Sequence, residues 1–165
     1  MSISSLYFTS LMRVAARLIA LCSTLIVSTA SSEVTRFTFA RVTGSEGGIG
    51  YEDGDGALAR FNRPTGVATD SAGNVYVADL DNDEVRKITP DGYTTTLAGL
   101  AGSTGKTNGV GAAASFNAPG GIAVDPQGNV YVADIGNNLI RKITQAGIVS
   151  SFAGSGFPGG GDGTG

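Results

Sequence analysis

The chain has 165 residues, which is enough for one domain of ordinary size, and 26 of them are glycine. It contains no histidine, so the sequence excludes an imidazole base for a serine or cysteine nucleophile. The formal net charge is −3 and no basic stripe is present, which argues against a nucleic-acid partner. Abundant glycine with alternating valine, isoleucine and tyrosine favours short strands joined by tight turns.

The N-terminal segment has the pattern of an export signal. Arg13 and Arg17 precede an apolar run over 18–27, and small residues follow that run. We therefore expect residues 1–30 to be a signal peptide cleaved after Ala30, and the protein to be secreted or held in the cell envelope. The alternative is a retained membrane anchor, although the run is shorter than the roughly 20 residues that a span needs.

The rest of the chain contains an internal repeat with a fixed offset of 55 residues. Three segments recur in the same order, with 66–70 returning at 121–125, 74–79 at 129–134 and 85–89 at 140–144. A fixed period indicates one copied structural unit whose faces must be covered by neighbours.

Each copy predicts four strands in chain order. We place them at 65–70, 74–80, 84–89 and 93–98, and then at 120–125, 129–135, 139–144 and 148–153. The first turn of each copy begins with aspartate and ends with glycine, which are type I turn preferences. Four antiparallel strands per unit predict an all-β fold of β-propeller blades, each a four-stranded sheet with both faces covered. An extended solenoid fits less well, because its units usually hold one strand or one helix pair.

Three motifs in each copy resemble those of a known family. The order Pro-x-Gly-[VI]-Ala-x-Asp, x-Gly-Asn-Val-Tyr-Val-Ala-Asp and [VI]-Arg-Lys-Ile-Thr resembles the NHL repeat. The likeness covers about residues 41–165, with repeats at about 61–115 and 116–165. It implies that residues 31–165 form part of a propeller, commonly six-bladed, that is used mostly as a binding platform.

The two ends of the chain fit an incomplete ring. Residues 35–43 look like the fourth strand of a blade whose first three strands are missing, and the sequence stops at Gly165 inside a linker. We expect the chain to be an N-terminal piece of a longer propeller, in which further blades close the ring. Self-association of several copies is the alternative, because two blades leave apolar outer faces bare.

Charged residues recur at matching positions in the two copies. Asp79 and Arg86 in the first copy correspond to Asp134 and Arg141 in the second. Opposite charges on paired strands predict a cross-strand contact that stabilises each repeat. The alternative is a polar rim that contacts a ligand on one propeller face, so these four residues form the candidate site.

The segment Asp79–Asp83 alternates carboxylates, as the start of a calcium-binding loop does. Glu84 stands where an EF-hand needs glycine, and Pro90 stands where it needs a bidentate glutamate. We therefore expect an Asx-type turn there and no cofactor, with a weak surface Ca²⁺ site as the alternative.

Two classes of function remain open from the sequence. The first is a secreted binding or scaffold module for a protein, peptide or glycan, which is not an enzyme. The second is a fragment of a propeller enzyme, of the lyase or lactonase type, whose catalytic residues lie in missing blades. The lack of a recognisable catalytic set favours the first, since function depends on the chemistry of a site and not on the fold.

Overall fold

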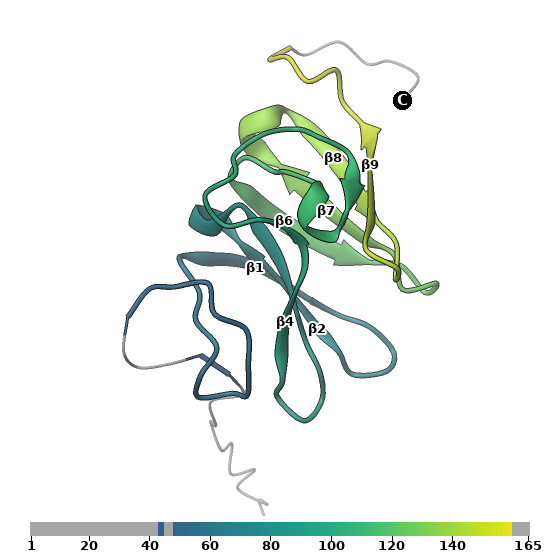
Figure 1. Ribbon diagram of the computed structural model, residues 1–165. Coiled ribbons are helices and arrows are strands. Elements are labelled where there is room, and N and C mark those ends of the chain that lie inside the picture. Colours follow the sequence, from purple (N-terminus) through teal and green to yellow (C-terminus); the bar gives the residue numbers. More distant parts are fainter. Residues whose placement is uncertain (1–42, 45–47, 160–165) are drawn as a thin grey trace, which may run out of the picture. The chain divides into compact units, whose positions relative to one another are not determined.

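A computed structural model describes residues 43–44 and 48–159 of the chain, and within them the fold is all-β (Figure 1). The first sheet has four antiparallel strands in sequence order: β1 (Pro64–Thr69), β2 (Val75–Asp79), β3 (Glu84–Ile88) and β4 (Thr94–Gly99). The second sheet repeats this arrangement with β6 (Pro119–Val124), β7 (Val130–Asp134), β8 (Leu139–Ile143) and β9 (Ile148–Ala153). These bounds lie within one residue of the predicted strands, so the predicted all-β fold class is confirmed. The two described sheets do not close into a ring.

The turns inside each sheet follow from aspartate and glycine at their ends. Gly73 donates its backbone N–H to the carbonyl of Asp70, and Gly128 donates in the same way to Asp125, at 3.1 and 2.9 Å. Both glycines have positive φ, +84° and +77°, which a side chain at these positions would disfavour. The Asp carboxylates also accept backbone N–H groups within the turn, so the local sequence alone fixes where β1 ends and β2 begins.

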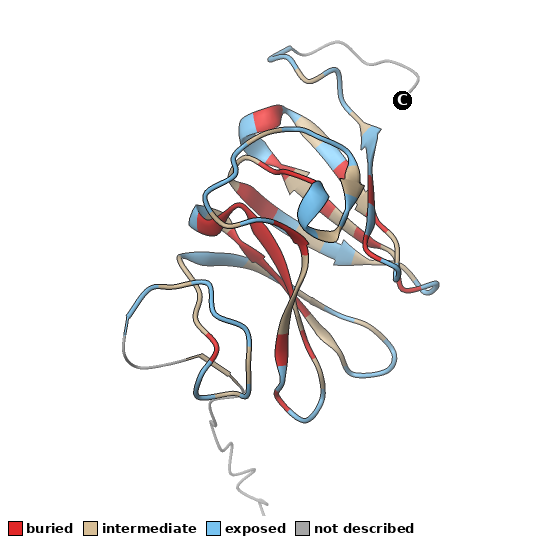
Figure 2. Cartoon of the chain, in the orientation of Figure 1, coloured by how far each residue is buried: buried red, intermediate tan, exposed pale blue. Residues whose placement is uncertain are grey.

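The two sheets pack against each other, and the core lies between them. Figure 2 shows buried positions concentrated on the strands where the sheets meet, with exposed positions on the loops. β1 and β6 lie side by side, and a Cβ placed on Gly66 would approach the carbonyl oxygen of Gly120 to 2.2 Å. The core joins Tyr76, Val85 and Ala98 of the first sheet to Phe116, Val130, Val132, Ile143 and Val149 of the second repeat.

The segments that precede each sheet are also ordered by it, which the strand prediction did not include. A two-residue strand, β5 (Gly109–Val110), pairs with β9 and makes the second sheet five-stranded. The equivalent contact in the first repeat is an isolated bridge between Gly54 and Thr94. Each blade therefore holds its own preceding linker along its outer strand.

Several sequence-based expectations concern residues outside the described ranges. The expected signal peptide at 1–30 lies there, and so does the strand expected at 35–43 except for Thr43. Thr43 sits in a bend, with its hydroxyl 2.9 Å from that of Thr94. Within the described part of the chain, no helix has the length and apolar character needed to cross a membrane.

Candidate functional site

The candidate residues Asp79 and Arg86 meet in the interior of the first blade. They come from paired strands β2 and β3, and neither side chain is exposed to solvent. Arg86 Nη1 donates to Asp79 Oδ2 at 3.2 Å, and the guanidinium carbon lies 5.1 Å from the centre of the Phe61 ring. The contact predicted from the repeated charges is thus present, and it is buried inside the blade.

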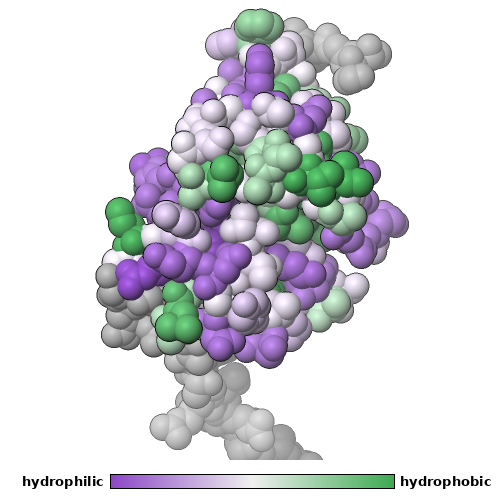
Figure 3. Space-filling model, viewed as in Figure 1, coloured by the Kyte–Doolittle hydropathy of each residue, from purple (hydrophilic) through white to green (hydrophobic). Residues whose placement is uncertain are grey.

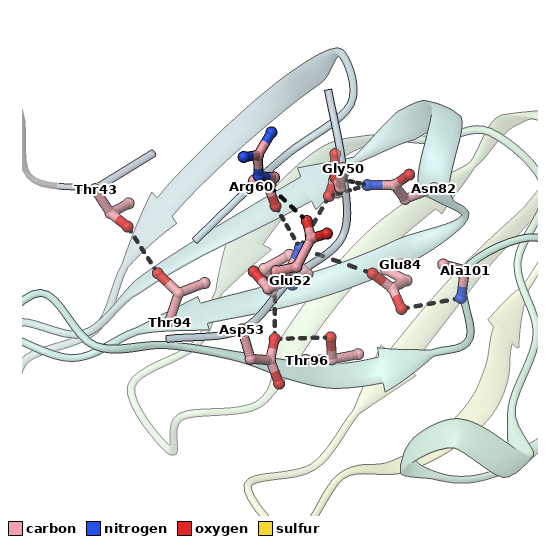
Figure 4. A network of polar contacts seen from close by, with 12 residues as sticks. Thr43, Gly50, Glu52, Asp53, Arg60, Asn82, Glu84, Thr94, Thr96 and Ala101 are labelled. Carbon is pink, nitrogen blue, oxygen red and sulfur yellow. Dashed lines mark hydrogen bonds and ion pairs between the residues drawn. The ribbon is translucent and has the colours of Figure 1, made fainter. Parts of the chain in front are cut away.

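Arg86 also binds the backbone of the linker in front of β1 (Figure 4). Its Nη1 donates to the carbonyl of Arg60 at 2.9 Å, and its Nη2 donates to the carbonyl of Glu52 at 3.0 Å. The same Nη2 donates to the Asp53 carboxylate at 2.7 Å. One guanidinium therefore fastens a segment more than 25 residues earlier in the chain to the middle of the sheet, and we call this arrangement the linker clamp.

The second repeat builds the linker clamp again at an offset of 55 residues. Arg141 Nη1 donates to Asp134 Oδ2 at 2.9 Å and to the carbonyl of Ser115 at 3.0 Å. Its Nη2 donates to the carbonyl of Thr107 at 3.0 Å and to Asn108 Oδ1 at 2.8 Å. Because the whole set recurs with the same geometry and full burial, it explains the repetition of the charges without a ligand. A ligand-contact role for the four residues stays a prediction.

The turn after Asp79 differs from the expected Asx-type turn. It is a 3-10 turn, η1 (Leu80–Asn82), which ends at Asp83 with φ of +55°. The Asp79 carboxylate accepts hydrogen bonds from the Asn82 side chain and from the backbone N–H of Asn62, both at 2.7 Å. The carboxylate therefore caps the linker and not its own turn. Among the described residues no three His, Cys, Asp or Glu side chains are grouped to hold a metal ion.

Glu84 is the one buried acid that the second repeat lacks, because Leu139 occupies its place. Its Oε1 accepts the backbone N–H of Ala101 at 3.0 Å, whereas its Oε2 lies 3.8 Å from Arg86 Nη1 and accepts no hydrogen bond from the described residues. Burial raises the pKa of Glu84 to about 6, although the charge of Arg86 acts in the opposite direction.

A polar cavity of about 220 Å³ lies between the first turns of the two blades. The β1–β2 turn of the first repeat and the β6–β7 turn of the second form its walls. Six polar side chains that line it are Asp70, Tyr76, Lys87, Asp125, Gln127 and Gln145. We call this the inter-blade cavity, and the residue pattern did not reveal it because it needs both blades in contact.

Hydrogen bonds keep the two aspartates of the inter-blade cavity ionised. The amide of Asn74 lowers the pKa of Asp70, and the amide of Asn129 lowers that of Asp125 in the same way. The Tyr76 hydroxyl donates to Asp70 at 3.0 Å, and burial together with this carboxylate raises the pKa of Tyr76 to about 12. The cavity thus offers fixed carboxylates, amides and one ammonium group from Lys87, which suit hydrogen bonding to a polar ligand.

Comparison with known proteins agrees with the blade architecture. The family model described as NHL repeat matches residues 61–88 and 116–143, the strands β1–β3 and β6–β8 with their preceding residues. This chain is an NHL-repeat protein. Its two sheets are blades of a β-propeller, as the motifs predicted, and the linker clamp is a feature of each NHL blade in it.

Relatives of this NHL-repeat chain are much longer proteins. It is 36% identical over 96 residues to Protein SUPPRESSOR OF QUENCHING 1, chloroplastic, of Arabidopsis thaliana, a match that covers 58% of this chain and 9% of the relative. NHL repeat-containing protein 2 of Homo sapiens is also 36% identical over 96 residues, covering 56% and 13%. A crystal structure of an auxiliary nutrient binding protein from Bacteroides ovatus aligns with a TM-score of 0.55 and 30% identity, over 68% of this chain and 28% of that one.

Proposed function

We propose that this NHL-repeat chain is a binding module that takes a polar ligand, a peptide or a glycan, in the inter-blade cavity. The observation that carries the proposal is the cavity itself, which is lined by the same polar turn from two successive repeats. Amide, carboxylate and ammonium groups in one small concavity are the kind of group that orients a bound molecule. The Bacteroides relative supports this proposal, because its description is that of a nutrient-binding protein.

The proposal places the site apart from the linker clamps. Arg86 and Arg141 are completely buried, so a ligand could reach them only after the linkers had come away. In contrast, Ala72 and Gln127 of the inter-blade cavity are exposed. We also propose that the module acts outside the cell or in the cell envelope, on the basis of the signal-like segment at 1–30. The enzyme alternative stays a prediction, since the described residues supply no catalytic set for it.

Blocking the cavity tests the proposal. The full chain is passed over printed arrays of short peptides and of oligosaccharides, and each hit is measured again by surface plasmon resonance. Ala72→Trp fills the cavity mouth with an indole, and we expect it to weaken binding by at least about tenfold, or 1.4 kcal/mol. Ala146→Trp makes the same change in an exposed turn of the second blade, outside the cavity lining, and should bind as the wild type does.

The outcomes distinguish the possibilities clearly. Binding that Ala72→Trp removes and Ala146→Trp keeps would support the site. A wild-type chain that retains no peptide or oligosaccharide, or equal binding by both variants, would refute it.

A further inference from the structure

The outer face of the second blade carries the same apolar positions that the first blade buries. We define this outer face by four residues of β7, β8 and β9, namely Tyr131, Ile140, Phe152 and Ala153. The first blade uses the equivalent positions, 55 residues earlier, to pack against the second blade: Tyr76, Val85, Leu97 and Ala98. Val85 and Ala98 are completely buried there, whereas Ile140 is 38% exposed and Phe152 is 54% exposed.

The first blade presents the complementary side. At the contact between the blades, Ile122 and Val124 of β6 pack on the core. The equivalent of Ile122 in the first blade is Val67 on β1, which is 68% exposed. Thr69, the equivalent of Val124, is exposed as well. Each copy of this chain therefore shows one half of the blade–blade contact at each side, and the two halves match by the repeat.

A polar tie between the blades also has an unused equivalent. Asp83 Oδ1 accepts the backbone N–H of Ala118 at 2.8 Å, where Ala118 has φ of +52°. Asn138 stands in the place of Asp83 and is exposed at the second blade. Arg63 stands in the place of Ala118 with nearly the same φ, +55°. A side-chain carbonyl of Asn138 can accept the same hydrogen bond that the Asp83 carboxylate accepts.

We propose that the outer face of the second blade binds the first blade of another copy of this chain, head to tail. The contact repeats the observed blade–blade packing, with Ile140 and Phe152 of one copy on Val67 of the next. The continuity of this contact with the one inside the chain identifies the occupant, because no other shape on the page matches the face by register. The interface is heterologous, so two different surfaces meet and both remain available at the ends of an assembly. Figure 3 shows apolar side chains gathered over the part of the surface that Figure 1 draws as the second sheet and its linker.

Sedimentation velocity of the full chain over a range of concentrations tests the inference. We expect wild-type chain to associate, and Ile140→Asp to weaken that association by at least about 100-fold, because the contact would bury an unpaired carboxylate. Val67→Asp alters the opposite surface and should weaken it equally. Leu100→Asp changes an exposed leucine in the loop after β4, outside both surfaces, and should associate as the wild type does.

Mixing the two defective variants separates a broken interface from a broken fold. Ile140→Asp chains keep an intact Val67 surface, and Val67→Asp chains keep an intact outer face. A one-to-one mixture should therefore form a heterodimer that neither variant forms alone and that cannot grow further. A wild-type chain that stays monomeric at every concentration overturns the inference. So does association that Ile140→Asp leaves unchanged, or a mixture that stays monomeric while wild type associates.

Discussion

Glu84 places a measurable cost on the folded first blade, and its removal should stabilise the protein at neutral pH. The pKa of this carboxyl rises from its ordinary value of 4.5 to about 6 on burial, which corresponds to about 2 kcal/mol of folding free energy. The folded chain holds the proton more tightly than the unfolded chain does. The contribution of Glu84 to stability is therefore full below pH 4.5 and is lost as the pH rises through 6.

The variant Glu84→Gln keeps the side-chain length and the acceptor for the Ala101 N–H but cannot ionise. Urea unfolding between pH 4 and 8 should show the variant more stable than wild type by about 2 kcal/mol above pH 7, with the difference vanishing near pH 4.5. Leu139→Gln exchanges one neutral side chain for another at the equivalent position, so its effect should not depend on pH. A Glu84→Gln difference that is constant across this range would falsify the reasoning.

Three further changes follow from the structure. Arg141→Met should lower the free energy of unfolding by about 3–5 kcal/mol, because it leaves a buried carboxylate unpaired, while Lys142→Met at the next, partly exposed residue should cost less than about 1 kcal/mol in the same urea experiment. Gly66→Ala should cost about 1–3 kcal/mol, since its methyl group would meet the backbone of the next blade, whereas Gly121→Ala has room and should unfold as wild type does. Absorbance at 295 nm should show that the phenol lost in Tyr76→Phe ionises near pH 12, and a difference that titrates near pH 10 would contradict this while circular dichroism reports a folded chain.

The sequence predicted the strands well because their signals are local. Asp70 and Gly73 mark the first turn by side-chain capping and positive φ, and both properties act within four residues. The fixed offset then applied the same reasoning to the second copy, so errors in one blade could be checked against the other. The missed strand β5 has two residues and exists only because β9 offers a free edge beside it.

The site was harder to predict because its contacts are long-range. The pairing of Asp79 with Arg86 follows from charges on adjacent strands, and it was visible in the sequence. Nothing in the pattern showed that Arg86 would also hold the carbonyls of Glu52 and Arg60, since backbone acceptors have no sequence signature. The inter-blade cavity likewise depends on how closely two separate turns approach.

The linker clamp changes what counts as one copy of the repeat. Every polar partner of Arg86 and Asp79 lies within residues 50–99, and every partner of Arg141 and Asp134 lies within residues 105–154. These spans begin well before the matches to the family model at 61 and 116. A duplication or deletion that breaks the chain between 100 and 104 would move whole, self-satisfied modules. A break between linker and strands would instead leave a guanidinium without its carbonyls, so growth of such arrays by recombination should favour the first kind of junction.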